Sequence, residues 1–143
     1  MSAQVVRFEA AKPVGVNELY RPGQVFGPGG TRRLKIRKSE AGEAFGQRLL
    51  LAARAVWRRL GLESLGGTSK RRVPVSVSIW MTFETYANDI DGPIKPILDS
   101  LQAAKIVFND NRIDELHVYR RPPDRARPRV EVVAHELEQD EAS

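Results

Sequence analysis

The stretch that organises this chain reads Asn88-Asp89-Ile90-Asp91-Gly92-Pro93-Ile94-Lys95-Pro96-Ile97-Leu98-Asp99. Asp89 and Asp91 are two residues apart, so in an extended segment both carboxylates point to the same side of the chain. Two carboxylates held this close repel each other unless a cation lies between them. An oxygen-rich site that leaves room for water is typical of Mg²⁺. The spacing therefore predicts a metal site where a strand leads into a helix.

A helix is expected to follow this acidic pair. Apolar residues recur at positions i, i+3, i+4 and i+7, the stripe of a helix packed on a sheet: Ile94, Ile97, Leu98 and Leu101. Asp91, Lys95 and Asp99 recur every four residues and fall on a different face. Pro93 suits a first helical turn, so regular helix should begin there and leave Asp91 just outside it. The spacing alone also fits a simpler interpretation, in which Asp91 caps the helix and Asp89 is a solvated loop residue.

The residues downstream extend the pattern. Lys95 and Asp99 are followed by Leu101, then by the apolar run 106–108, and then by Asp110 and Ile113. This arrangement resembles the RusA family of Holliday-junction resolvases, whose motif is DxDN-x2-K-x3-D-x-L followed by an apolar pair and an acidic pair. The resemblance is dense over residues 89–119 and thin elsewhere.

Two positions depart from the family motif. The chain has Gly92 where the family has asparagine, and Asn109 where the family has the first member of its acidic pair. Neither departure removes one of the carboxylates that the resemblance assigns to metal.

The resemblance implies a homodimeric, Mg²⁺-dependent endodeoxyribonuclease that resolves four-way DNA junctions by paired phosphodiester hydrolysis in recombination and repair. By position, the catalytic residues would be Asp89, Asp91, Asp110 and Lys95, and the three aspartates would bind the metal. Mn²⁺ is an alternative to Mg²⁺. Asp99 matches a motif acid that serves either as a supporting acid or as a structural residue.

Periodicity predicts a single α/β or α+β domain over residues 1–134, with a mixed β-sheet and two main helices packed on it. Alternating patterns indicate strands at 5–10, 32–38, 73–83, 113–120 and 130–134, and the strand at 73–83 should be central. Helices are expected at 39–60 and from 93 onward. Residues 11–30, rich in proline and glycine, should form a long loop. The acidic residues 135–143 should form a flexible tail.

The charge favours a polyanionic partner, since the 143-residue chain carries a net charge of +5 and has a pI near 9.9. The candidate DNA contacts fall in three basic clusters: Arg32, Arg33, Lys35, Arg37 and Lys38; Lys70, Arg71 and Arg72; Arg121, Arg125 and Arg127. The first cluster fits equally well a charged strand edge that discourages aggregation. The chain has no cysteine, which excludes disulfides and thiolate metal sites. It has no apolar run that could span a membrane, so a soluble cytoplasmic protein is expected.

Two other functions fit the same residues. One is a DNA- or junction-binding module of the same fold that has lost catalysis, of which Gly92 and Asn109 would be signs. The other is a Mg²⁺-dependent phosphohydrolase that uses the Asp-x-Asp pair on a small phosphate ester. The basic composition and the lack of a phosphate-cradling glycine loop favour the nuclease over this second alternative.

Overall fold

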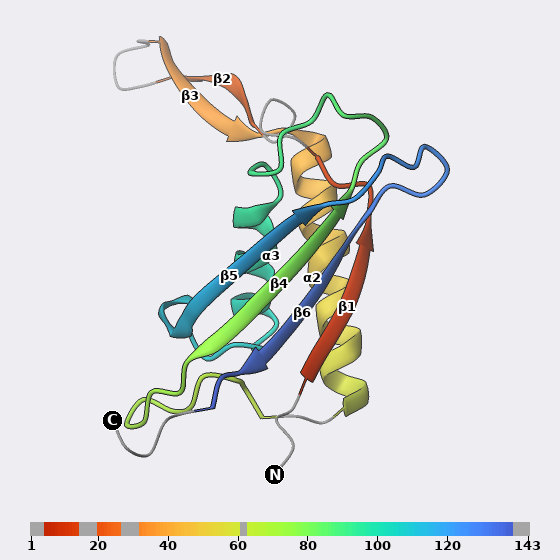
Figure 1. Ribbon diagram of the computed structural model, residues 1–143. Helices are drawn as coiled ribbons and strands as arrows, with labels where there is room; N and C mark the ends of the chain where they lie inside the picture. Colours follow the sequence, from red (N-terminus) through yellow and green to blue (C-terminus); the bar gives the residue numbers. More distant parts are fainter. Residues whose placement is uncertain (1–4, 15–19, 27–31, 61–62, 139–143) are drawn as a thin grey trace.

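The computed structural model describes residues 5–14, 20–26, 32–60 and 63–138 (Figure 1). The elements follow in chain order: β1 (Val5–Ala11), β2 (Tyr20–Phe26), β3 (Arg32–Lys38), α2 (Glu40–Leu60), β4 (Val75–Thr82), α3 (Ile94–Ala103), the short 3₁₀ turn η2 (Asp110–Arg112), β5 (Ile113–Arg120) and β6 (Arg129–Glu136).

Four of the strands form one mixed sheet in the order β1-β6-β4-β5. β4 pairs antiparallel with β6 and parallel with β5, and β1 pairs antiparallel with β6. The predicted mixed sheet with two helices is therefore confirmed, and the strand expected to be central is β4. Because β4 and β5 run in the same direction, α3 has to carry the chain back along the sheet between them.

The core lies between one face of this sheet and the two helices (Figure 1). α2 begins after Ser39, whose hydroxyl accepts a hydrogen bond from the Gly42 backbone N–H at 3.0 Å and so caps the first turn. The buried residues alternate along each strand and recur at helical spacing on α2 and α3: Val6, Phe8 and Ala10; Val75, Val77, Ile79 and Met81; Val130, Val132 and Ala134; Phe45, Leu49, Ala53 and Val56; Ile97 and Leu101.

The opposite face of the sheet carries aromatic and charged side chains. Trp80 on β4 and Tyr119 on β5 are neighbours in the parallel register, and their rings stack with centroids 5.6 Å apart. The guanidinium of Arg121 lies 5.8 Å from the centre of the Trp80 ring. This face is thus held by ring stacking and cation–π contact rather than by an apolar layer.

One expectation was wrong in the N-terminal part. Residues 20–26, inside the predicted loop, form β2, which pairs antiparallel with β3 from Tyr20↔Lys38 to Phe26↔Arg32. The predicted strand 32–38 is confirmed as β3, but it pairs with β2 in a separate two-stranded sheet and not with the main sheet. Pro22 and Gly23 mask the strand pattern of β2, since both residues are rare within strands. Residues 15–19 and 27–31 of the predicted loop lie outside the described residues.

The C-terminal boundary also differs. β6 continues through His135 and Glu136, two residues into the predicted flexible tail. The backbone N–H of Leu137 donates to the carbonyl of Pro74 at 2.8 Å. The last strand therefore extends two residues beyond residue 134, where the alternation of apolar residues predicted its end. Residues 139–143 lie outside the described part of the chain.

The packing of α2 gives a test of this fold. Leu49 is fully buried and Leu51 is 66% exposed on the same helix. Leu49→Ala should lower the free energy of unfolding by about 2–5 kcal/mol, because it leaves a cavity in the core. Leu51→Ala, the matched control, should change it by less than about 0.5 kcal/mol. Urea unfolding measures both, and equal effects would contradict the assigned orientation of α2.

Candidate functional site

Asp89 and Asp91 lie in the loop that joins β4 to α3, and both side chains are exposed. Ile90 between them is half-buried and packs against the core. Residues 90–93 form a turn, so the extended segment that the spacing argument assumed is not observed, although both carboxylates reach solvent. The Ile94 backbone N–H donates to the Asp91 carbonyl at 3.3 Å, so Asp91 lies just before the helix, as predicted. The loop thus presents two carboxylates to solvent at the N-terminal end of α3.

Lys95 and Asp99 are one turn apart on α3 and form an ion pair at 3.5 Å. Their side chains are 74% and 50% exposed, and an exposed pair of this kind contributes about 0–1 kcal/mol. Lys95 can therefore exchange Asp99 for another anion at little cost. Pro96, at the third position of α3, is tolerated because the first N–H groups of a helix have no partner within it.

Asp110 lies at the other end of α3. Its backbone N–H donates to the side chain of Gln102 at 3.3 Å, close to where α3 ends, whereas Asp91 lies before α3 begins. The ten residues of α3 span about 15 Å. Two hydrogen bonds between segments distant in the sequence support this placement. Arg72, just before β4, donates to the carbonyl of Asn111, the neighbour of Asp110. Arg120, at the end of β5, donates to the carbonyl of Asn88, the neighbour of Asp89. The two acidic positions belong to opposite ends of the sheet.

The predicted convergence of Asp89, Asp91 and Asp110 within one chain is therefore wrong. The physical reason is the parallel pairing of β4 with β5, which places the start of β5 beside the start of β4 and not beside its end. Within residues 5–14, 20–26, 32–60 and 63–138, no three His, Cys, Asp or Glu side chains group closely enough to hold a metal ion. Asp89 and Asp91 remain together on one loop.

The surroundings of Asp110 are built from local polar contacts. Asn109 caps the turn η2, since its side chain accepts a hydrogen bond from the Asn111 N–H at 3.1 Å. Arg112 is buried there and donates to the Thr68 carbonyl at 3.1 Å. Gly66 faces it with φ of +98°, and a Cβ on Gly66 would come within 2.8 Å of the Arg112 side chain. Asn109, at the position where the RusA motif has an acid, thus serves as the cap of this turn.

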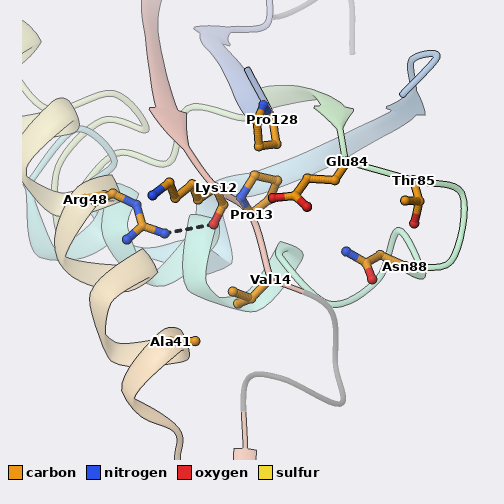
Figure 2. Close-up of a pocket in the computed structure, with 9 residues that line it drawn as sticks. All are labelled: Lys12, Pro13, Val14, Ala41, Arg48, Glu84, Thr85, Asn88 and Pro128. Atoms are coloured by element: carbon orange, nitrogen blue, oxygen red, sulfur yellow. Dashed lines mark hydrogen bonds between the residues drawn. The ribbon is translucent and has the colours of Figure 1, made fainter. Parts of the chain in front are cut away.

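A cavity of about 370 Å³ lies next to the loop of Asp89 and Asp91 (Figure 2). Its polar lining includes Lys12 after β1, Arg48 on α2, and Glu84, Thr85 and Asn88 after β4. Sequence reasoning placed neither Glu84 nor Arg48 in a binding site. It missed the cavity because the segments that form it are far apart in the sequence.

The candidate DNA contacts divide into engaged and free side chains. Arg72 pairs with Asp114, Arg121 with Glu131 at 3.5 Å, and Arg127 with Glu9. In the part of the chain that the structure describes, three exposed cations of the same clusters form no ion pair: Lys70, Arg71 and Arg125. The backbone of β3 carries Arg32, Arg33, Lys35, Arg37 and Lys38, whose side chains the structure does not describe.

The pair between Arg72 and Asp114 gives a pH prediction. The hydrogen bond from Arg72 lowers the pKa of the Asp114 carboxyl below its usual value of about 3.9. A carboxyl with a lowered pKa stabilises the fold above its unfolded pKa, and that contribution is lost as the pH falls through the folded pKa. Arg72→Gln should therefore raise the pKa of Asp114, measured by NMR titration of its carboxyl carbon. Arg71→Gln is the control, and an unchanged Asp114 titration in Arg72→Gln would refute the pairing.

Comparison with known proteins adds no identification: no protein-family model matches this chain, and no curated sequence is similar to it. Among the described helices, none is both long enough and apolar enough to cross a membrane.

Proposed function

We propose that this protein is a Mg²⁺-dependent endonuclease that cuts branched DNA as a homodimer. The observation that carries the proposal is the loop between β4 and α3, which presents Asp89 and Asp91 to solvent with Lys95 one turn into the helix. The net charge of +5 supports a polyanionic substrate. The motif resemblance over residues 89–119 supports a four-way junction as the form of that substrate.

The residues of the loop suit a hard cation. Two exposed carboxylates leave most coordination positions to water and substrate oxygens, which is how Mg²⁺ is commonly bound. Mg²⁺ held there would supply Lewis-acid activation of the phosphate and a lower pKa for the attacking water. Lys95 would direct its ammonium at the negative charge that develops on the phosphate. Asp99, paired with Lys95 at 3.5 Å, would position that ammonium.

Asp110 can join this site only from a second copy of the chain. A two-fold axis that sets the sheets of two copies antiparallel places the start of β5 in one copy near the end of β4 in the other. The Asp110 of each copy then faces the Asp89 and Asp91 of its partner, and two equivalent sites result. A four-way junction offers two symmetric strands for two such sites.

Mixing two inactive variants tests this shared site. Asp91→Asn and Asp110→Asn should each abolish cleavage alone. After mixing and subunit exchange, half of the dimers contain both chains, and each of these has one intact site, which should restore roughly a quarter of the wild-type nicking. The product should be a nicked junction rather than a resolved one, because the second site carries both substitutions.

The outcome separates the two arrangements. If all three aspartates acted within one chain, every site in the mixture would contain a substitution and no activity would return. The readout is a labelled synthetic four-way junction with Mg²⁺, with a linear duplex and a chelator as controls. A wild-type chain that cuts neither substrate would refute the nuclease proposal.

Lys95 gives a separate test of the chemistry. Lys95→Ala should reduce the cleavage rate by roughly 10²–10³, the usual loss when one transition-state donor is removed. Binding of the junction should persist, since one exposed cation among many supplies little of the affinity. Lys105→Ala is the matched control, because Lys105 follows the other end of α3. A normal rate in Lys95→Ala would show that its assigned role is wrong.

A second candidate function is a DNA-binding module without catalysis. The observation that favours it is the separation of Asp110 from the acidic loop by the length of α3, together with the use of Asn109 as a local cap. Such a module would bind the junction in the presence of a chelator and would cut nothing when Mg²⁺ is added.

A further inference from the structure

The cavity beside the acidic loop has two chemically different sides. Figure 2 shows Lys12 and Arg48 together on one side, and Glu84, Thr85 and Asn88 on the other. Asn88 directly precedes Asp89, so the cavity and the acidic pair share one loop. Ligand clefts in proteins commonly start near about 300 Å³, and this cavity, at about 370 Å³, reaches that size.

The backbone of Lys12 adopts a conformation that lysine rarely takes. Its φ is +55°, in the left-handed region where a Cβ crowds the backbone. Its N–H donates to the Pro128 carbonyl at 3.0 Å, and its carbonyl accepts a hydrogen bond from Arg48 Nη2 at 2.8 Å. Lys105 has a similar φ of +62°, so the conformation alone does not mark a site. What distinguishes Lys12 is its place in the lining of the cavity, beside Arg48.

Arg48 both holds this strand end and adds a second cation. Its Nε donates to the Ala11 carbonyl at 2.8 Å, and its Nη2 to Lys12, so two of its five N–H donors are used. Burial lowers the pKa of Arg48, which nevertheless stays charged at neutral pH. Among the described residues, neither Lys12 nor Arg48 forms an ion pair with a carboxylate. The cavity therefore has one side with two cations and free donors.

We propose that this cavity binds a phosphate group of the DNA backbone, with Lys12 and Arg48 donating to its non-bridging oxygens. The inference rests on the proposed function for its ligand, and it places a bound phosphate beside the loop that carries Asp89 and Asp91. A guanidinium with free donors and an adjacent ammonium match the charge and geometry of a phosphate. The carboxylate of Glu84 on the other side confines the phosphate to the side of Lys12.

A pair of glycine variants tests the role of Lys12. Lys12 and Lys105 both have positive φ, at +55° and +62°, so Lys12→Gly and Lys105→Gly relieve the same strain and remove the same charge. Lys105 follows α3, at the end of the molecule away from the acidic loop. Both variants should unfold at temperatures no lower than the wild-type chain, which establishes that both are folded.

Binding of a fluorescent four-way junction is then measured in chelator over a series of salt concentrations. Lys12→Gly should weaken binding about tenfold at low salt and reduce the slope of log K against log salt by about one, because one phosphate contact is lost. Lys105→Gly should change neither quantity. Equal effects of the two variants, or no effect of either, would overturn the assignment of Lys12.

Glu84→Gln supplies an independent readout. Removing the carboxylate opposite Lys12 should tighten junction binding in chelator several-fold, and this gain should disappear in the double variant with Lys12→Gly. A gain of the same size in both backgrounds would mean that Glu84 does not act on a phosphate held by Lys12.

The failure of this inference is distinguishable from that of the proposed function. A wild-type chain that binds the junction but does not cut it would refute the nuclease and leave the phosphate site standing. A wild-type chain that cuts the junction, with Lys12→Gly matching Lys105→Gly in binding, would refute the phosphate site alone. A wild-type chain that binds no DNA would overturn both.

Discussion

Parallel pairing of β4 with β5 is the constraint on which the arrangement of the molecule depends. Neighbouring parallel strands cannot be joined by a tight turn, so a crossover segment must return along the sheet. α3 is that segment, and it packs Ile97 and Leu101 into the core on the way. The loop directly before α3 therefore lies at one end of the sheet, and the turn directly after α3 lies at the other. The positions of the motif residues follow from this single topological fact.

The sequence predicted the elements of the main sheet well because their patterns are strong. The alternation around Val77 and Ile79 marks a strand with one buried face, and the stripe through Phe45 and Leu49 marks the long helix. β2 escaped prediction because Pro22 and Gly23 interrupt it. The order of the strands could not be predicted, since the pairing of β4 with both β6 and β5 depends on contacts between distant segments.

The candidate site shows the same division between local and distant information. The start of α3 after Asp91 follows from local spacing, and the structure agrees with it; the interval of four also accounts for the contact between Lys95 and Asp99 on one face of α3. The position of Asp110 depends on where a helix ends in space, which spacing along the chain does not give. The contact between Arg48 and the carbonyl of Lys12 joins residues 36 positions apart, and no local pattern signals it.

The stack of Trp80 on Tyr119 gives the molecule a built-in optical reporter. Trp80 lies on the sheet face away from the helices, while the second tryptophan, Trp57, lies on α2 and packs against the core. In a Trp57→Phe background, indole emission comes from that one face. Covering it would shift the fluorescence to shorter wavelength, and because Trp80 does not line the cavity of Lys12, the emission reports on that sheet face without an attached dye.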